Sequence, residues 1–156
     1  GVITTAIKAG IAGKEIISAA VASMTQLNDI ASQVAVSAGA SGATDVTGFG
    51  LLGHLGKMVL ASDIEAVIDV ANIEFLPGAK LYAQDGVISG GTRRNLAWIE
   101  DQIDAGSYGE TDLLLLADAQ TSGGLIFGVD KYKSGGAWEE LNERGVAAVV
   151  IGVTLA

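Results

Sequence analysis

The grouping of glycine is the feature that most constrains how this chain can fold. The sequence holds 22 glycines and one proline among 156 residues, roughly twice the usual share of glycine. The glycines gather at 48–53, 90–91 and 123–124, each time beside polar side chains. Because glycine has no Cβ, it adopts left-handed backbone conformations and lets another group approach the backbone closely. The fold must therefore contain tight turns, and close approach is expected at these three segments.

The length and the apolar content predict one domain with a core of its own. A chain of 156 residues lies in the usual size range of a domain, and 49% of its residues are hydrophobic. No apolar run approaches the ~20 residues of a bilayer span, and no secretory signal is recognisable, so we expect a cytoplasmic domain that does not enter a membrane. The absence of cysteine excludes disulfides, thiolate metal sites and a cysteine nucleophile within the chain. Because the sequence starts at Gly1 inside an apolar run, we also expect it to be a segment of a longer polypeptide.

The charge of the chain limits the classes of partner. Eighteen acidic and nine basic residues give a formal net charge of −9. Nucleic acids and anionic membranes would be repelled by such a surface, and no basic stripe compensates for it. A polyanionic small molecule could still bind through a metal ion or a local cluster of donors.

Hydrophobic periodicity predicts alternating helices and strands. Helices are predicted at 14–23, 51–59, 78–85, 93–104 and 134–144, and a further one within SMTQLNDIASQVAVSAG (23–39), which carries an apolar stripe from Leu27 to Ala35. The expected caps are a capping box at Ser23 and Gln26 and a cap at Thr92, and the expected stops are Gly39 and Gly145. Strands are predicted at 43–46, 64–70, 125–129 and 147–155, the second of them buried, while 113–116 fits either a helical turn or a buried strand. This order indicates one layered α/β (α+β) domain with a mixed sheet.

The first glycine segment, TDVTGFG, places Asp45 at the end of a predicted strand and just before the amino-terminal end of a helix. Gly48 and Gly50 would let backbone amides approach a ligand at that positive helix end. A carboxylate there would repel a phosphate unless a divalent cation such as Mg²⁺ lay between them. The alternative is an aspartate that only caps the turn. The segment is neither a Walker loop nor a dinucleotide fingerprint, because the required lysine and spacing are absent.

The other two glycine segments each allow a structural and a functional interpretation. In SGGTRRN, Arg93 and Arg94 fall in the first turn of a helix, where the helix dipole disfavours cations. A bound anion, the acidic residues at 100–104, or plain exposure to water could compensate. The segment DAQTSGG (118–124) fits either a hydrogen-bonding loop at a cleft or an ordinary polar turn.

Familiar catalytic arrangements are missing from the sequence. His54 is the only histidine, and a packed or capping role is favoured over a catalytic one because no orienting partner is evident. There is no G-x-S-x-G elbow, and one histidine without cysteine does not make a zinc site. The residues alone therefore indicate one candidate metal carboxylate and two polar glycine loops, with no nucleophile or general base.

Together the three segments resemble a known family. ATDVTGFGLLGH, GGTRRN and QTSGGL, in this order, are similar to the C-terminal domain of selenide, water dikinase (selenophosphate synthetase), and GVITTA and SMTQLN add to the resemblance. The resemblance covers nearly the whole chain. It implies an α/β/α fold like the C-terminal domain of aminoimidazole ribonucleotide synthetase, with 1–156 as the single C-terminal domain of a two-domain enzyme. It further implies phosphorylation of hydrogen selenide by ATP to give selenophosphate, AMP and phosphate.

The resemblance also implies roles for individual residues. In the family, Mg²⁺ and ATP bind between two domains, and the aspartate of this motif, here Asp45, joins the metal ligands. The N-terminal domain supplies the remaining metal aspartates, a lysine and the reactive cysteine or selenocysteine, so no catalytic residue is expected in this chain. The residues expected to line the ATP cleft are Thr47, Gly48, Gly50, Gly91, Thr92, Asn95, Gln120, Thr121, Ser122, Gly123 and Gly124.

The implied partners are the N-terminal domain, ATP and selenide, in a cytoplasmic enzyme that is a homodimer at full length. This chain alone is expected to be inactive. One departure from the family is Ala119, where many relatives have proline before QTSGG, which should affect only the turn. Two alternatives stay open: a non-catalytic binding or assembly module of the same fold, and a paralogous ATP-dependent synthetase with another acceptor.

Overall fold

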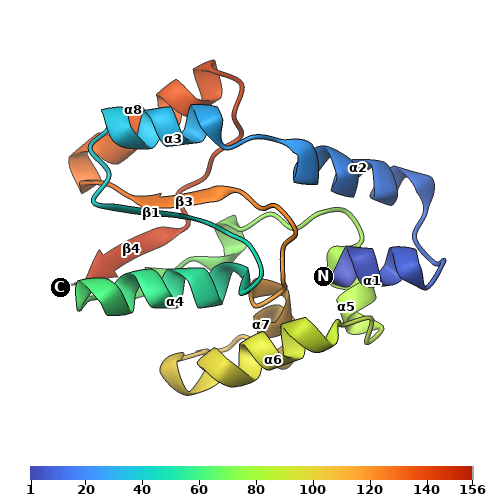
Figure 1. Ribbon diagram of the computed structural model, residues 1–156. Coiled ribbons are helices and arrows are strands. Elements are labelled where there is room, and N and C mark those ends of the chain that lie inside the picture. Colours follow the sequence, from blue (N-terminus) through green and yellow to red (C-terminus); the bar gives the residue numbers. More distant parts are fainter. Residues whose placement is uncertain (156) are drawn as a thin grey trace. The chain divides into compact units, whose positions relative to one another are not determined.

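The protein is an α/β protein with eight described helices and four short strands, as the computed structural model of residues 1–155 describes it (Figure 1). The helices are α1 (Val2–Lys8), α2 (Lys14–Thr25), α3 (Asp29–Ser37), α4 (Gly50–Ser62), α5 (Ala79–Gln84), α6 (Gly90–Ile99), α7 (Glu110–Leu116) and α8 (Lys131–Glu143). The strands are β1 (Gly42–Asp45), β2 (Glu65–Ile68), β3 (Leu125–Gly128) and β4 (Gly152–Leu155). Two short 3-10 turns cover Val70–Asn72 and Glu100–Gln102. Within this described part of the chain, no helix has the length and apolar character that crossing a membrane would require.

The chain forms two compact units, each assembled from separated segments. Unit 1 contains residues 1–26, 46–56 and 75–123, and unit 2 contains residues 27–45, 57–74 and 124–156. Unit 1 is built from helices, whereas both pairs of strands belong to unit 2.

The core of unit 1 forms where α1 packs against α2 and α5, and α5 against α7. Its buried members are mostly small or aliphatic: Val2, Ile3, Ala20, Ala79, Ala83 and Leu115. The alanines let the helices approach closely, and half-buried residues such as Ile16 and Phe75 fill the rim. The sequence of α7, ETDLLLL, explains its position, because Leu114, Leu115 and Leu116 are all buried.

The core of unit 2 lies between two helices and a strand pair. Strands β1 and β3 pair antiparallel, and α3 and α8 lie side by side next to them (Figure 1). Val34 and Leu141 are buried between the helices, and Leu125 and Phe127 of β3 pack against them. The second pair, β2 with β4, is also antiparallel, with Val67 opposite Val153.

The expected class is confirmed, and the details of the sheet differ. The described strands form two separate antiparallel pairs where one mixed sheet was expected. Strand β2 alternates between exposed and half-buried residues, so the prediction of a buried strand was wrong. The final strand covers four residues rather than nine, because β2 offers only four residues for pairing.

The two predicted helix caps were wrong, and both predicted stops are correct. Ser23 lies inside α2, which continues to Thr25, and the Thr25 hydroxyl donates to Val21 O of its own helix at 2.9 Å. Helix α6 starts three residues before its predicted first turn because Ser89, and not Thr92, is its N-cap. Gly39 and Gly145 end α3 and α8 with φ of 72° and 77°, values that glycine adopts without strain.

Candidate functional site

The first glycine segment forms a tight loop in unit 1, between Val46 and the start of α4. Its centre is the carbonyl oxygen of Thr47, which accepts a hydrogen bond from Gly50 N at 3.0 Å and closes the turn. The same oxygen accepts a second bond, also 3.0 Å long, from Gln120 N. One carbonyl group therefore joins the TGFG segment to the QTSGG segment, about seventy residues further along the chain.

Two of the glycines at this junction are needed for contact between backbones. Gly50 has φ of 69°, and a Cβ placed on it would lie 2.5 Å from the carbonyl carbon of Ala117. A Cβ on Gly123 would collide with the carbonyl oxygen of Val46. Gly48 and Gly124, in contrast, face open space. The close approach predicted from the sequence is thus made by the chain's own backbone at Gly50 and Gly123, and only the other two glycines offer room for a ligand.

Asn95 of α6 brings the third segment into the same cluster. Its Nδ2 donates to Gly48 O at 2.8 Å and to Ala117 O at 3.1 Å. The first acceptor belongs to the TGFG loop, and the second follows α7, directly before the DAQTSGG segment. The three glycine segments that the sequence singled out are therefore joined by hydrogen bonds within unit 1.

The buried carboxylate of Asp118 also belongs to this cluster, through a hydrogen bond with Thr92 of α6. Asp118 is only 7% exposed, and its Oδ1 accepts from the hydroxyl of Thr92, which is 0% exposed, at 2.5 Å. Its Oδ2 accepts from the backbone N–H of Val2 at 2.9 Å, and Ser89 Oγ lies 2.9 Å from Thr92 Oγ1. Thr92 is therefore a structural member of the cluster with its hydroxyl directed at Asp118.

Sequence reasoning selected the DAQTSGG segment but did not single out Asp118, its first residue. Nothing in its spacing distinguishes it from the exposed acids of the chain. The available signal was its position directly after the buried leucines of α7 and Ala117, where a carboxylate is buried only if several donors meet it.

The only histidine has a local partner. His54 Nε2 lies 3.1 Å from Thr47 Oγ1, and the ring meets Phe49 edge-on with centroids 5.6 Å apart. Phe49 also packs on Trp98 of α6, at 6.1 Å between centroids. These contacts agree with the packed role that the sequence favoured for His54, and they attach the loop to α4 and α6.

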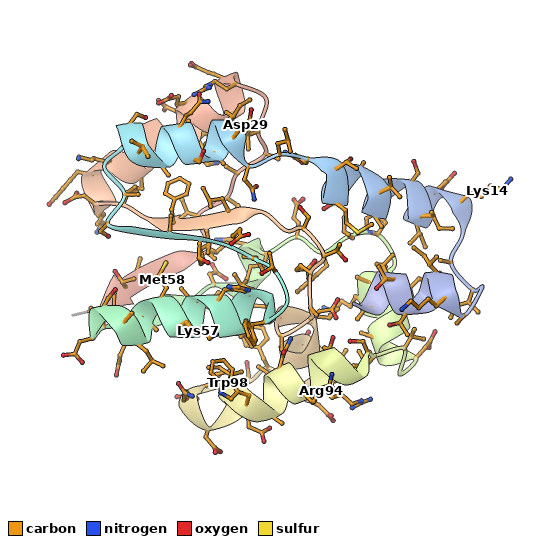
Figure 2. The ribbon with its side chains drawn as sticks, viewed as in Figure 1. Lys14, Asp29, Lys57, Met58, Arg94 and Trp98 are labelled. Carbon is orange, nitrogen blue, oxygen red and sulfur yellow. The ribbon has the colours of Figure 1, made fainter. Side chains whose placement is uncertain are left out.

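The arginines of the third segment have a different neighbour from the one considered. Arg93 pairs with Glu110 at 3.7 Å, and both side chains are largely exposed. Among the described residues no ion pair joins it to the acids at 100–104, so that suggested partner was wrong. The side chain of Arg94 projects from the same helix, α6, as that of Trp98 (Figure 2). An exposed pair of this kind contributes little stability.

Asp45 is the last residue of β1 and belongs to unit 2. It is exposed, and its partner across the ladder is Leu125, so the two side chains project from the same face of the strand pair. Within residues 1–155 no group of three or more histidine or acidic side chains could hold a metal ion. Among the described residues, Asp45 is therefore not part of an assembled metal site. A single exposed carboxylate is compatible with Mg²⁺, which proteins commonly hold through one or two carboxylates together with substrate phosphates and water.

The remaining residues that were expected to line the cleft differ in their exposure and hydrogen bonding. Gln120 is tied inward, since its side-chain amide donates to Asp118 O at 2.9 Å. Thr121 and Gly124 are exposed, and Gly91 and Ser122 are half-buried. The structure therefore brings most of the predicted residues into one unit, with Asp45 and Gly124 in the other.

Comparison with known proteins identifies the family. Residues 4–156 match the family described as AIR synthase related protein, C-terminal domain. The selenide, water dikinase of Carboxydothermus hydrogenoformans is 41% identical over 154 residues, which cover 98% of this chain and 45% of that protein. The selenide, water dikinase of Myxococcus xanthus is 39% identical, with 97% and 44% covered. That of Pasteurella multocida is 42% identical over 130 residues, with 83% and 36% covered.

The chain therefore spans less than half the length of these curated relatives. Their names confirm the resemblance to selenide, water dikinases that the three glycine segments indicated. The match over residues 4–156, together with these relatives, leads to one conclusion: the chain belongs to the AIR synthase related protein, C-terminal domain family.

Proposed function

We propose that this chain is the C-terminal domain of a selenide, water dikinase. The whole enzyme phosphorylates hydrogen selenide: ATP, hydrogen selenide and water give selenophosphate, AMP and phosphate. The observation that carries the proposal is the joining of three separated segments, all three resembling those of this enzyme family, through Thr47 O and Asn95 in one compact unit. The names of the relatives support the same reaction.

The chain's own contribution is to binding and orientation. An N-terminal domain would supply the reactive cysteine or selenocysteine, a lysine and further metal ligands. Asp45 would add one carboxylate to the Mg²⁺ that accompanies ATP, and bound Mg²⁺ would neutralise phosphate charge. The open position at Gly48 leaves room for a ligand at the TGFG loop of unit 1. The full-length enzyme would be a cytoplasmic homodimer.

The test uses the full-length polypeptide that contains this chain. ATP consumption is followed by phosphorus NMR with and without selenide, for the parent protein and for Asp45→Asn. We expect selenophosphate and AMP to form only with selenide. In Asp45→Asn the rate should fall by about two orders of magnitude, since charge stabilisation at a transferring phosphate commonly contributes that much. The Mg²⁺ concentration for half-maximal rate should rise in the same variant.

Asp63→Asn is the matched control. Asp63 is also an exposed aspartate of unit 2, and its φ of 53° suits asparagine as well as aspartate. Its rate and Mg²⁺ dependence should equal those of the parent. An Asp45→Asn enzyme with parental rate and Mg²⁺ dependence would remove the metal role. ATP consumption independent of selenide would indicate a paralogous synthetase, and no consumption at all would indicate a binding module.

A further inference from the structure

Asn95 makes two hydrogen bonds with a single nitrogen. Its Nδ2 donates to Gly48 O at 2.8 Å and to Ala117 O at 3.1 Å. A side-chain amide nitrogen carries two hydrogens, so these two bonds use its full donor capacity. Asn95 therefore has no N–H left for a nucleotide, although the sequence placed it among the residues that line the cleft.

The two acceptors lie at places where the backbone needs an anchor. Gly48 is the exposed tip of the TGFG loop, and a Cβ there would meet nothing within 4 Å. Ala117 is the residue that ends α7, and its backbone lies against Gly50. The side-chain amide of Asn95 thus joins the tip of the TGFG loop, at Gly48, to the backbone of Ala117, against which Gly50 of the same loop packs.

The element that carries Asn95 is itself well fixed. Helix α6 is capped by Ser89, whose side chain accepts from Thr92 N, and Leu96 and Ile99 are buried. Because the peptide bond is planar, holding Gly48 O also fixes the direction of the Phe49 N–H on the same peptide plane. A rotation of this plane would change which groups the loop offers to a ligand.

We propose that Asn95 is a positioning residue whose Nδ2 sets the orientation of the Gly48–Phe49 peptide and donates no hydrogen bond to the nucleotide. The role in catalysis rests on the proposed function, because the loop would then orient the phosphates of ATP. The role in ordering the loop does not rest on it. Misplacement of a reacting group by about 1 Å can lower a rate by roughly 100-fold, so a loss of this anchor should be visible in kcat.

The test compares Asn95→Ala and Asn95→Gln in the full-length protein. Alanine removes both bonds and suits a helix, so α6 should persist. Glutamine keeps the donors on a longer side chain and should restore part of the effect. The matched control is Asn72→Ala in unit 2, which removes a bond of the same kind, from Nδ2 to Val150 O at 3.2 Å.

Two readouts separate this proposal from the proposed function. Amide hydrogen exchange of the 46–53 segment should become at least tenfold faster in Asn95→Ala, intermediate in Asn95→Gln and unchanged in Asn72→Ala. The selenide-dependent kcat should fall by 10- to 100-fold in Asn95→Ala, with the KM for ATP changed less than threefold. Asn72→Ala should leave both constants unchanged.

Each result decides one question. Unchanged exchange at 46–53 in Asn95→Ala would overturn the proposal. A raised KM for ATP with parental kcat would also overturn it, because Asn95 would then bind the nucleotide directly. If exchange at 46–53 is faster in Asn95→Ala and the parent protein shows no selenide-dependent activity, the anchoring role is supported while the proposed function fails.

Discussion

At the residue scale, the main result concerns the glycines. Close approach of another group to a glycine was expected at three segments, and the structure shows backbone contact of this kind at two of them, at Gly50 and at Gly123, whereas a Cβ on Gly90 or Gly91 would meet only side-chain atoms at 3.3 Å or more. The sequence could not indicate what approaches them, because the neighbours of Gly50 and Gly123 are backbone atoms from distant parts of the chain, Ala117 and Val46. Such contacts leave no local pattern in the sequence. The glycines of these loops therefore serve two purposes, packing at some positions and open space at others.

Gly50→Ala should be much more costly than Gly10→Ala. Both glycines have φ near 70°, so alanine pays a left-handed backbone cost of about 1–2 kcal/mol at either position. At Gly50 the new methyl group also meets the backbone of Ala117, whereas Gly10 faces open space. Overpacking of this kind adds about 1–3 kcal/mol. Urea unfolding should show the difference in the free energy of unfolding, and equal losses in the two variants would contradict this packing role.

At the element scale, helix α6 shows how a prediction can find an element and misplace its start. The sequence SGGTRRN contains two possible caps, Ser89 and Thr92, and the apolar periodicity fits a start after either one. The structure uses Ser89, because Thr92 donates its hydroxyl to the buried Asp118. This tertiary bond cannot be read from local sequence.

Thr92→Val tests this use of Thr92. Valine keeps the shape of the side chain but removes the hydroxyl, which leaves Oδ1 of the buried Asp118 without that donor. Leaving a buried polar group unsatisfied costs about 1–3 kcal/mol, and more for a charged group. The control is Thr25→Val, since the hydroxyl of Thr25 is exposed and bonds only to its own helix, at Val21 O and Ala22 O. Thermal unfolding should show a clearly larger loss of Tm for Thr92→Val, and equal losses would show that the bond to Asp118 stabilises nothing.

Elements that are determined by local sequence were predicted well, and elements whose extent depends on distant partners were predicted less well. Helices α2, α4, α5 and α8 have an apolar stripe or a glycine stop and were found near their true positions. The leucines of α7 gave no period, because that helix is buried over its last three residues and shows no polar face there. The short strands were found by composition, but their extent depends on partners 80 or more residues away.

The same argument applies to the candidate site. The three segments could be selected from the sequence because each of them groups glycines beside polar side chains. Their junction at Thr47 O, the bridging role of Asn95 and the buried Asp118 depend on the fold. Sequence reasoning therefore selected segments that the structure joins by hydrogen bonds, and their role as a binding site stays a prediction.

At the scale of the whole molecule, the chain combines a helical unit with a unit that holds the strands. The curated relatives are more than twice as long as the part matched by this chain. Asp45 is the single metal ligand that we propose for the chain. A complete Mg²⁺–ATP site would therefore need groups from outside it.

The isolated chain should show no selenide-dependent release of AMP. One carboxylate and no nucleophile cannot carry the proposed reaction, so phosphorus NMR should show unchanged ATP with selenide and Mg²⁺ present. The full-length polypeptide, measured in parallel, serves as the positive control. Detectable selenophosphate from the 156-residue chain alone would contradict our assignment of the reactive groups to another domain.

The pairing of the strands has a consequence for folding during synthesis. Strand β1 pairs with β3 and β2 pairs with β4, and both partners lie after residue 124. During synthesis on the ribosome, β1 and β2 emerge well before their partners β3 and β4. All segments of unit 1, in contrast, have been made once residue 123 has emerged. Since chains begin to fold as they are made, the helical unit can form first, and β1 and β2 stay unpaired until β3 and β4 have emerged. That interval is when a nascent chain of this topology most needs protection from aggregation.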